Sequence, residues 1–586
     1  MKTTTWARWA TAALLAQAGV AAAAPDCTVQ ALQQLNVPKM TITAAKLVPA
    51  AAGLPAHCDV QGSVVTEGEG AGPGSAGIGL VLPASFSGHF MFGGGRGTGG
   101  NLGNSANKPD IDVSLARGYA SATTDSGHSG REENWYYVGK PGVPNAPKLT
   151  DYYYRATHQA TVASKEFVKS YYRQPIAHAY FNGCSNGGRQ AITEAVRYPD
   201  DFDGIIVGCP WLDPAGSALL NVQRTKSFLD PARYIPLDKF TAIDDAVLAK
   251  CDLYDGVKDG LIQNPSRCDF DPHSLVPKLL TQAQADALDH YFDAVRDPQG
   301  NLVHPGSSVA RLQAQFNGVR NNGDGTPLRA MLYEKPAPFP TAPAPWGEGK
   351  NESHNWNSAR GVIQDLAFND EAFDMNNGIF DARGAVKPDL LKALYDKLGV
   401  EVVADPAKLQ AFLKKGGKIL MYHGLSDVTI NGFGTILYYE ALAEQNGGYD
   451  RLKDQVRLFL VSGMQHCNDG PDPVFFDTLT AMENWVEKGM APATMIAQYT
   501  ADTGKTNTRT LPLCPFPIQA RYGGSGDVKI AANWSCPAGD KGMLEVARNG
   551  AQAGMKDNLA RYTARFKSYP AATMPTSILS AAGTAK

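Results

Sequence analysis

The chain has 586 residues, of which 43% are hydrophobic, so it is long enough for a large core and for about two to four domains or one large domain with an insertion. Its formal net charge of −3 provides no excess of basic residues of the kind that nucleic-acid-binding proteins use, and we expect no nucleic-acid partner. The function therefore has to be sought in local motifs.

Residues 1–24 have the pattern of a signal peptide. Lys2 and Arg8 accompany an apolar run, and Ala22, Ala23 and Ala24 stand directly before Pro25. The uncharged run is shorter than the roughly 20 residues that a membrane span needs, which argues against the alternative of a membrane anchor, and no later segment reaches that length. We therefore predict that the protein is secreted or periplasmic and has no membrane partner.

A core strand is expected over residues 85–92, and it leads into a glycine-rich loop over residues 93–100. Gly95 to Gly100 has the spacing G-x-G-x-x-G, which also occurs in dinucleotide-binding sites. The residues that follow, 101–104, do not begin a helix whose N-terminus would hold a pyrophosphate. We therefore do not expect a nucleotide at this loop.

Strands and helices alternate in the next part of the chain. A strand-like segment at 118–122 precedes a polar turn at 123–128, a helix is expected over 152–172, and a buried strand over 202–208. This alternation predicts a mostly parallel sheet.

Residues 177–191 predict a strand, a sharp turn and a helix. Gly183, Ser185 and Gly187 have the spacing of a nucleophile elbow, in which glycines on both sides of the serine let the strand and the helix approach closely. Because G-x-S-x-G also occurs in ordinary loops, Ser185 needs a base and an acid elsewhere before it counts as a nucleophile.

The pattern becomes irregular and rich in proline from about residue 211 to about residue 398. We interpret this segment as a lid inserted between sheet strands, which would supply pocket walls and determine substrate choice. Its aromatic residues either line a pocket for an aromatic ring or pack the lid's own core. The residues concerned include Trp346, Trp356, Phe368 and Phe373.

Two later strands lead to an acid and a base. A buried-type strand over residues 418–424 is followed by Asp427, and a second one over residues 456–461 is followed by His466. With an elbow serine, the acid and the histidine follow in this chain order. Ser185, Asp427 and His466 are therefore the candidate catalytic triad.

Two other histidines compete with this assignment. His89 opens a strand and is expected to be structural, whereas His128 lies in the polar turn and precedes the serine in the chain. His466 has additional support, because Cys467 follows it and Cys184 precedes Ser185. A serine and a histidine within hydrogen-bond reach would bring these cysteines to the Cα separation of a disulfide, about 5.5–6 Å.

These residues resemble the signature of a known family, the secreted tannases and feruloyl esterases of the α/β-hydrolase fold, which also contains the hydrolase of mono(2-hydroxyethyl) terephthalate. The signature is a Cys-Ser pair, an Asp and a His-Cys pair, which stand here as Cys184-Ser185, Asp427 and His466-Cys467. Segments 183–189 and 422–427 also resemble the family's motifs, and the resemblance extends over nearly the whole mature chain.

The resemblance implies an α/β fold, with an α/β-hydrolase core, a mostly parallel sheet and a large inserted lid. The predicted division is a signal peptide at 1–24, a first core part at 25–212, a lid with a calcium loop at 213–398 and a second core part at 399–586. Such hydrolases take one oxyanion amide from a glycine-rich loop and the other from the residue after the nucleophile. The resemblance assigns these to Gly97 and Asn186, although the choice among the loop glycines stays open.

The lid contains an acidic, glycine-turned loop that suggests a calcium ion as cofactor. Its three aspartates supply the hard oxygen ligands that calcium prefers, although their spacing is not that of an EF-hand. The resemblance implies a Ca²⁺ site made of the carboxylates of Asp252, Asp255 and Asp259 and the carbonyls of Val257 and Leu261. The alternative is a solvated acidic turn.

Nine cysteines in an exported chain imply disulfides and one unpaired thiol. Besides Cys184 with Cys467, proximity in the sequence favours Cys27 with Cys58, Cys251 with Cys268, and Cys514 with Cys536. Cys209 would then be the unpaired cysteine, in an apolar segment expected to be buried.

The sequence thus predicts a secreted serine carboxylic-ester hydrolase that acts through an acyl-enzyme on a small aromatic ester. The resemblance favours esters of hydroxybenzoic or hydroxycinnamic acids, such as gallates and ferulates, over a terephthalate monoester. A monoester would favour an arginine in the lid that grips its free carboxylate, for which Arg329 and Arg360 are candidates. Two other classes stay open, an exported serine peptidase and a non-catalytic, calcium-stabilised binding protein.

Overall fold

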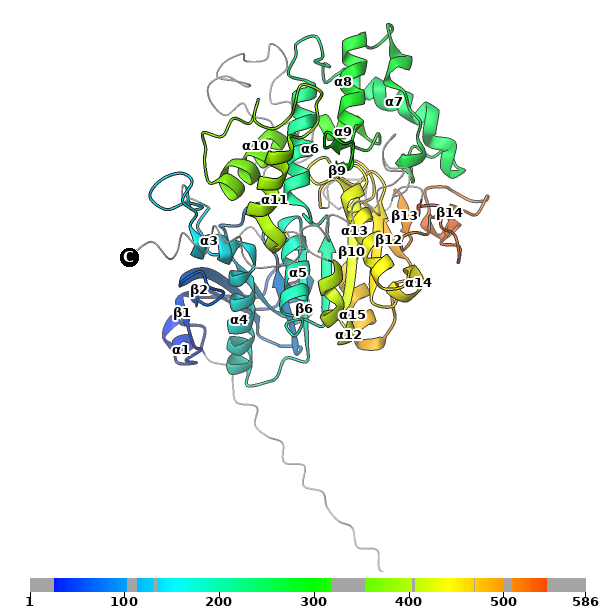
Figure 1. Cartoon of the computed structure of the whole chain (residues 1–586). Coiled ribbons are helices and arrows are strands. Elements are labelled where there is room, and N and C mark those ends of the chain that lie inside the picture. Colours follow the sequence, from blue (N-terminus) through cyan, green and yellow to red (C-terminus); the bar gives the residue numbers. More distant parts are fainter. Residues whose placement is uncertain are drawn as a thin grey trace, which may run out of the picture.

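The computed structural model describes residues 26–102, 113–130, 134–317, 354–402, 406–467, 470–499 and 508–544. The predicted signal peptide lies outside these ranges, and so do Arg329 and Trp346. Figure 1 shows one large body in which a twisted sheet occupies the lower half and a group of helices lies above it. Within the described residues, no helix combines the length and the apolar character needed to cross a membrane.

A nine-stranded sheet, in the order β1-β2-β3-β5-β4-β6-β7-β10-β11, forms the centre of the protein. Neighbours from β5 to β11 are parallel, whereas β1, β2, β3 and β5 pair in antiparallel fashion. The strands are β1 (Met40–Val48), β2 (His57–Thr66), β3 (Gly74–Pro83), β4 (His89–Gly93), β5 (Ala120–Thr124), β6 (His178–Cys184), β7 (Gly204–Gly208), β10 (Lys418–Gly424) and β11 (Val456–Val461).

The mostly parallel sheet predicted from the sequence is confirmed. The predicted segments correspond to β4, β5, β6, β7, β10 and β11, within a few residues at their ends. Strands β1 to β3 precede the strand that the sequence indicated first, and they extend the sheet at one edge. Strand β2 alternates strongly between buried and more exposed residues, as expected for an antiparallel strand.

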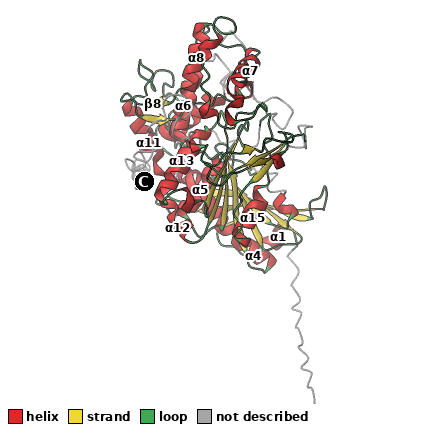
Figure 2. Cartoon of the chain, turned by 90° about the vertical axis from the view of Figure 1, so that its right-hand side faces the viewer, coloured by secondary structure: helices red, strands yellow, loops and turns green. Residues whose placement is uncertain are grey.

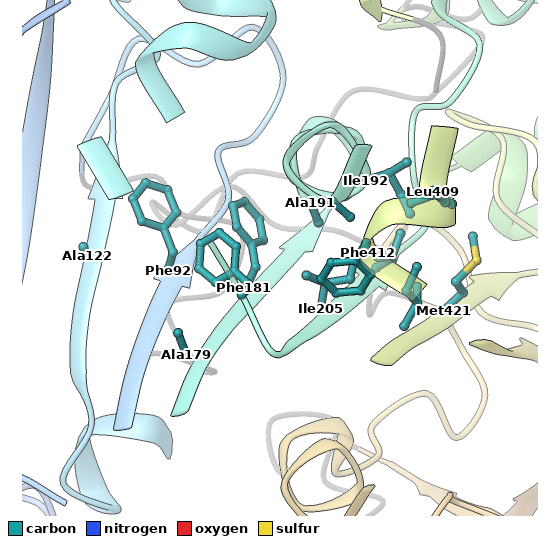
Figure 3. Packing of buried hydrophobic residues seen from close by; sticks show 14 of the residues in the cluster. Phe92, Ala122, Ala179, Phe181, Ala191, Ile192, Ile205, Leu409, Phe412 and Met421 are labelled. Atoms are coloured by element: carbon teal, nitrogen blue, oxygen red, sulfur yellow. The ribbon is translucent and has the colours of Figure 1, made fainter. Parts of the chain in front are cut away.

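Alternate residues of the central strands pack against helices on opposite faces of the sheet. One face carries Phe92 and Phe181, whose rings stack with centroids 5.4 Å apart, together with Ile205 and Met421 (Figure 3). The other face buries the intervening residues, such as Tyr180, under α15. Figure 2 shows helices on both sides of the strands. Helices around the sheet are α1 (Val29–Gln33), α4 (Ala156–Tyr172), α5 (Asn186–Arg197), α12 (Gln410–Lys414), α13 (Gly432–Gln445), α14 (Tyr449–Leu452) and α15 (Thr478–Lys488).

The chain between β7 and β10 forms the group of helices above the sheet, which we call the lid. Its helices include α6 (Pro214–Ser227), α7 (Lys239–Cys251), α8 (Gln282–Phe292), α9 (Leu312–Asn317), α10 (His354–Arg360) and α11 (Pro388–Val402), and they lie at the top of Figure 1. The expectation of an irregular segment is wrong for the described part, which is largely helical. The prolines were the cause of this error. Pro214 and Pro388 stand at helix starts, where a backbone N–H would have no partner inside the helix, so proline is tolerated there.

Smaller elements complete the fold. The short strand pairs are β8 (Val295–Arg296) with β9 (Leu302–His304), β12 (Met495–Gln498) with β13 (Thr510–Leu513), and β14 (Arg521–Tyr522) with β15 (Trp534–Ser535). A short helix α3 (Ala146–Thr150) runs into a π-helix (Asp151–Arg155) and then into α4. A second π-helix (Gly361–Phe368) follows α10 in the lid.

Four disulfides are present, and they match the predicted pairs. They join Cys27 to Cys58, Cys184 to Cys467, Cys251 to Cys268, and Cys514 to Cys536. Cys209 is a buried free thiol, as predicted.

Candidate active site

Ser185 lies at a sharp turn between β6 and α5. Its backbone has φ 66° and ψ −124°, a conformation that residues other than glycine rarely adopt and that is typical of a nucleophile elbow. The flanking glycines are sterically required, because a Cβ at Gly183 would lie 2.3 Å from the Gly187 oxygen, and one at Gly188 would lie 2.8 Å from the Gly208 oxygen. The strand and the helix therefore meet closely enough to expose Ser185 at the end of the strand.

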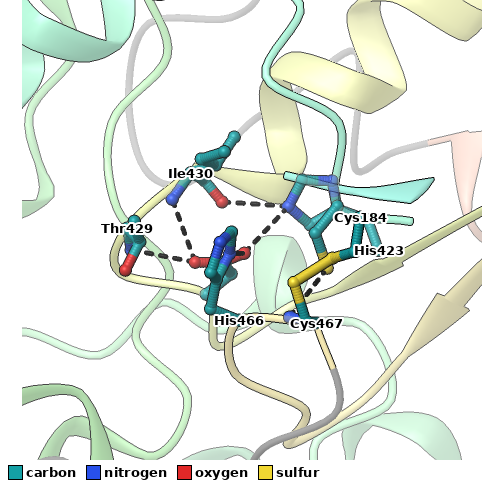
Figure 4. Close-up of a disulfide and its surroundings, with 8 residues drawn as sticks. Cys184, His423, Thr429, Ile430, His466 and Cys467 are labelled. Atoms are coloured by element: carbon teal, nitrogen blue, oxygen red, sulfur yellow. Dashed lines mark hydrogen bonds and ion pairs between the residues drawn. A yellow bond between two sulfur atoms is a disulfide. The ribbon is translucent and has the colours of Figure 1, made fainter. Parts of the chain in front are cut away.

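The disulfide between Cys184 and Cys467 connects this elbow to the loop that carries His466. The two Cα atoms are 5.8 Å apart, although 283 residues separate them in the chain. Ser185 and His466 each stand next to one of these cysteines, and Figure 4 shows His466 beside the disulfide. Among the described residues no hydrogen bond joins Ser185 to His466, so their proximity follows from the disulfide; in enzymes without substrate, catalytic hydrogen bonds are often long.

Asp427 binds His466 directly. Its Oδ2 lies 2.7 Å from His466 Nδ1, and its Oδ1 accepts the backbone N–H groups of Thr429 and Ile430 at 2.8 and 2.9 Å. Burial alone would raise the pKa of Asp427, but the charges and hydrogen bonds of His466 and His423 outweigh it and hold that pKa below the ordinary range. Asp427 is therefore an ionised, fully hydrogen-bonded partner for the histidine.

A second histidine, His423 on β10, also contacts Asp427. Its Nε2 lies 3.3 Å from Asp427 Oδ2 and 2.9 Å from the Ile430 carbonyl oxygen, and its Nδ1 lies 2.8 Å from Thr435 Oγ1. The sequence analysis treated His423 as part of a strand and gave it no role. Its position four residues before the candidate acid, at the carboxyl end of a strand, was the signal available.

The unpaired thiol of Cys209 lies in the same cluster. Its Sγ accepts the Cys467 N–H at 3.3 Å, and Cys209, Asp427 and His466 have side-chain heteroatoms within 4.8 Å of one another. Burial raises the pKa of the Cys209 thiol well above its ordinary value, with the nearby Asp427 charge as a second cause. The thiol is therefore protonated at neutral pH.

The glycine-rich loop after β4 packs against the elbow. A Cβ at Gly94 would lie 2.6 Å from the Gly187 Cα, and Gln190 binds this loop by accepting the Gly95 N–H at 2.8 Å. The Gly95 N–H therefore already has an acceptor. Gly97 is exposed and has φ 51°, and Asn186, as the first residue of α5, has an N–H without a partner inside the helix.

Arg189 is buried and holds the elbow helix against the π-helix (Asp151–Arg155). Its Nη1 and Nη2 donate to the carbonyl oxygens of Tyr153 and Tyr152 at 2.7 and 3.1 Å, and its Nε donates to Asn186 Oδ1 at 2.8 Å. Desolvation lowers the pKa of this guanidinium from its very high ordinary value. Arg189 is therefore a structural part of the elbow. It lies in the segment 183–189, and the sequence predicted no role for it.

The acidic loop follows α7 and is closed by the disulfide between Cys251 and Cys268. Backbone N–H groups bind each carboxylate: Asp252 accepts Gly260 N–H at 3.0 Å, Asp255 accepts Gln263 N–H at 3.1 Å, and Asp259 accepts Leu261 N–H at 3.0 Å. Asp259 also pairs with Arg509. Val257 and Leu261 bury their side chains in two different clusters, which fixes the loop at both sides.

The chemistry of this loop fits a cation in part. Burial, and then repulsion from Asp259 and Asp252, raise the pKa of Asp255 to about 7, which is the expected result for adjacent buried carboxylates without a metal. The three carboxylates are nevertheless less tightly grouped than other sets. Within the described ranges, the triplets of potential metal ligands that fall within 4.8 Å are Cys209, Asp427 and His466, and His158, Glu194 and Asp201.

The remaining predicted residues lie in structural settings. His89 bridges Ser87 and Glu487, and His128 stacks on Trp135 with ring centroids 3.9 Å apart. In the lid, Trp356 is buried, and Phe368 stacks on Phe373 at 4.7 Å. These three aromatic residues pack in a hydrophobic cluster that the lid shares with residues of the segment 135–154, which favours a packing role over the lining of a pocket. Arg360 donates to Asn357 Oδ1 at 2.9 Å.

Comparison with known proteins identifies the family. The family model for tannase and feruloyl esterase matches residues 58–537. A probable feruloyl esterase from Arthroderma benhamiae is 32% identical in an alignment of 483 positions that covers 78% of this chain and 81% of that protein. The mono(2-hydroxyethyl) terephthalate hydrolase of Piscinibacter sakaiensis is 30% identical in an alignment of 546 positions that covers 84% of this chain and 87% of that protein.

The fold agrees with this result. The crystal structure of feruloyl esterase B from Aspergillus oryzae superposes with a TM-score of 0.71 at 23% sequence identity, over 86% of this chain and 98% of that chain. At that identity the match supports the fold alone. The extent of the family match, together with the two relatives, shows that the chain belongs to the tannase and feruloyl esterase family of α/β-hydrolases and is a carboxylic ester hydrolase.

Proposed function

We propose that this esterase cleaves esters of hydroxybenzoic or hydroxycinnamic acids, with Ser185 as nucleophile, His466 as base and Asp427 as the acid that orients the base. The observation that carries the proposal is the covalent link between the elbow and the histidine loop, which puts Cys184 and Cys467 5.8 Å apart at Cα. The contact of 2.7 Å between His466 Nδ1 and Asp427 Oδ2 adds support, because it leaves Nε2 available for Ser185.

The reaction would proceed in two halves. Ser185 Oγ attacks the ester carbonyl carbon while His466 Nε2 accepts the hydroxyl proton, and the imidazolium then gives this proton to the leaving alcohol. The Asp427 carboxylate stabilises the imidazolium. Water next attacks the acyl-enzyme with His466 again as base, which releases the carboxylic acid and regenerates Ser185.

Backbone amides would stabilise the negative charge that develops on the carbonyl oxygen. We assign these donors to Gly97 and Asn186, supported by the contact of Gly94 with Gly187, which brings the two segments together. Removing one such donor typically costs about 10² to 10³ in kcat.

We also propose calcium as a structural ion of the lid, held by the carboxylates of Asp252, Asp255 and Asp259 and the carbonyls of Val257 and Leu261. Support comes from the three carboxylates of this loop, because Arg509 pairs with Asp259, while burial and then repulsion from Asp259 and Asp252 raise the pKa of Asp255 to about 7. Calcium would neutralise the carboxylates and stabilise the loop, and it has no part in the ester chemistry.

Export to the periplasm or the medium is a further proposal, for which the four disulfides give the structural support, because such bonds persist in oxidising compartments.

The substrate is tested by measuring kcat/KM side by side for methyl ferulate, methyl gallate, mono(2-hydroxyethyl) terephthalate and a peptide amide. We expect a phenolic ester to give the highest value and the amide to give none above the level of Ser185→Ala. A lead of about tenfold or more for the terephthalate monoester, roughly 1.4 kcal/mol of transition-state preference, would overturn the ranking. The relatives support both substrates to a similar degree, since they are 32% and 30% identical to this chain.

A further inference from the structure

The carboxylate of Asp427 has more hydrogen-bond donors than its pairing with His466 requires. Oδ1 accepts the N–H groups of Thr429 and Ile430, Oδ2 lies 2.7 Å from His466 Nδ1, and the edge of the His423 ring brings its Nε2 to 3.3 Å from the same Oδ2. His423 is fully buried, and it comes from the strand β10 rather than from the loop of Asp427. Figure 4 shows the His423 ring and the dashed contact that joins it to the Ile430 carbonyl.

The neighbours of His423 determine which of its nitrogens carries hydrogen. Nε2 faces the Ile430 carbonyl at 2.9 Å and the Asp427 carboxylate at 3.3 Å, and both of these are acceptors. Nε2 therefore bears a proton whether the ring is neutral or charged. Nδ1 faces the hydroxyl of Thr435 at 2.8 Å, which can donate to it and fix the ring in place.

We propose that His423 is a positioning residue of the catalytic triad, whose Nε2–H bridges the Ile430 carbonyl and Asp427 Oδ2 and so holds the carboxylate in the orientation that His466 requires. The proposal rests on the proposed function, because it assumes that Asp427 and His466 act as acid and base. His423 touches neither Ser185 nor the reacting atoms; it acts through Asp427.

A positioning role predicts a change in the pH dependence of the reaction. A carboxylate that loses a donor keeps more of its charge, so it attracts the proton of the neighbouring imidazolium more strongly. Without His423, the histidine base would therefore stay protonated to a higher pH, and the acidic limb of kcat/KM would move to higher pH. A loss of packing alone would lower activity at every pH without moving the limb.

Other ionisable groups around Asp427 do not account for such a shift. Within the described structure these are His466, the Cys209 thiol and the Arg224 guanidinium, whose Nη1 donates to the Val428 carbonyl at 2.8 Å. Burial raises the pKa of the thiol, and a guanidinium keeps its proton throughout the acidic range. Neither the Cys209 thiol nor the Arg224 guanidinium changes its protonation state in the pH range of the acidic limb.

The experiment compares the profiles of kcat/KM between pH 4.5 and about pH 8.5 for the full chain and for His423→Phe, His423→Gln and Thr435→Val. The probe is 4-nitrophenyl butyrate, read at a wavelength at which nitrophenol ionisation does not alter the signal. We expect His423→Phe to lower kcat/KM about tenfold or more and to move the acidic limb upward by about half a pH unit or more. His423→Gln, whose amide N–H can reach the place of Nε2–H, should move the limb back toward its original position.

Thr435→Val keeps the side-chain volume and removes only the hydroxyl that fixes the ring, so it tests the inference even where His423→Phe does not fold. We expect a smaller shift of the limb in the same direction. His57→Phe is the matched control, because His57 is a buried histidine whose Nδ1 faces one carbonyl, that of Pro55 at 2.9 Å, in a strand remote from the elbow. Its acidic limb should coincide with that of the parent.

Different results would contradict the positioning role of His423 and the proposed catalytic residues. If the acidic limbs of both His423→Phe and Thr435→Val coincide with that of the parent, or if only His423→Phe folds and leaves it unmoved, the positioning role is wrong. If Ser185→Ala, measured beside them, hydrolyses the ester at the parental rate, the proposed catalytic residues are wrong as well.

Discussion

Asp427 beside the elbow and Asp255 in the lid are both buried carboxylates, but their surroundings differ. Asp427 has two histidines and two backbone N–H groups, which hold its pKa below the ordinary range against the effect of burial. Asp255 has backbone N–H groups and two neighbouring aspartates, and burial raises its pKa to about 7. The site of Asp427, the first site, therefore has its charge balanced by groups of the chain itself, whereas we propose that calcium balances the charge of the second site, the loop of Asp255.

The largest loss of activity at the first site should follow from removal of the proposed nucleophile or base. We expect Ser185→Ala or His466→Ala to lower ester turnover by about three orders of magnitude or more, because loss of a triad member leaves only the catalysis due to binding and the oxyanion hole. Turnover is measured with a 4-nitrophenyl ester, and circular dichroism checks that the variants fold. Turnover near the parental level in a folded variant would contradict the triad.

The covalent link is the next largest contribution to the first site. Replacing Cys184 and Cys467 together by alanine should lower kcat about tenfold to a hundredfold, because small displacements of nucleophile and base are costly. The matched control replaces Cys514 and Cys536 by alanine. These cysteines form a disulfide just after β13 and β15, far from the elbow in sequence. Equal losses in the two double variants would mean that the first disulfide matters for stability alone. Peptide mapping of the parent without reductant has to show the bond between Cys184 and Cys467.

The proposed calcium ion at the second site is tested by chelation. Saturating calcium should raise the unfolding free energy by about 2.7 kcal/mol at a hundredfold excess over its Kd, and EDTA should lower the Tm of the purified protein by a few degrees. Asp255→Asn should abolish this response. Asp381→Asn is the control, because Asp381 accepts backbone N–H groups in an exposed turn of the same lid. A Tm that is insensitive to EDTA, with no metal found by elemental analysis, would leave an acidic turn as the correct reading.

The smallest expected effect is the pH dependence of this calcium response. Without a cation, Asp255 keeps its proton in the folded protein up to about pH 7, whereas in the unfolded chain it loses it near its ordinary value of 3.8. The stability of the calcium-free protein therefore falls as the pH rises from about 4 to about 7. Calcium replaces the proton, so the gain in Tm on adding calcium should be larger at pH 8 than at pH 5. An equal gain at both values would contradict a role for Asp255.

The difference between the two sites also explains what the sequence was able to predict. Ser185, Asp427 and His466 each follow a hydrophobic strand. The cysteines next to Ser185 and His466 indicate that these two residues lie close together, so the sequence pattern predicts the cluster. His423 has no such marker, because a histidine at the end of a buried strand usually has a structural role. Its relation to Asp427 depends on the turn through Ile430, which follows from three-dimensional contacts.

The lid was harder to predict for a different reason. Two of its helices, α6 and α11, begin at prolines, and its residues pack mainly in clusters distinct from the one under β4 and β6, so neither a 3.6-residue pattern nor a continuous strand pattern dominates the sequence. Strands β1 to β3 were missed because many of their positions carry small or polar residues, so the alternation seen in the burial of β2 and β3 is weak in their amino-acid sequence. The substrate preference stays a prediction, since it depends on side-chain packing in the lid rather than on motifs.

The link between Cys184 and Cys467 also has a consequence for oxidative folding. Cys209 follows Cys184 by 25 residues, whereas Cys467 follows it by 283, so a bond between Cys184 and Cys209 would close a far shorter loop. In the folded protein the Cys209 thiol is buried and accepts the Cys467 N–H beside the correct bond. Burial therefore keeps the competing thiol away from oxidants and thiol reagents in solution.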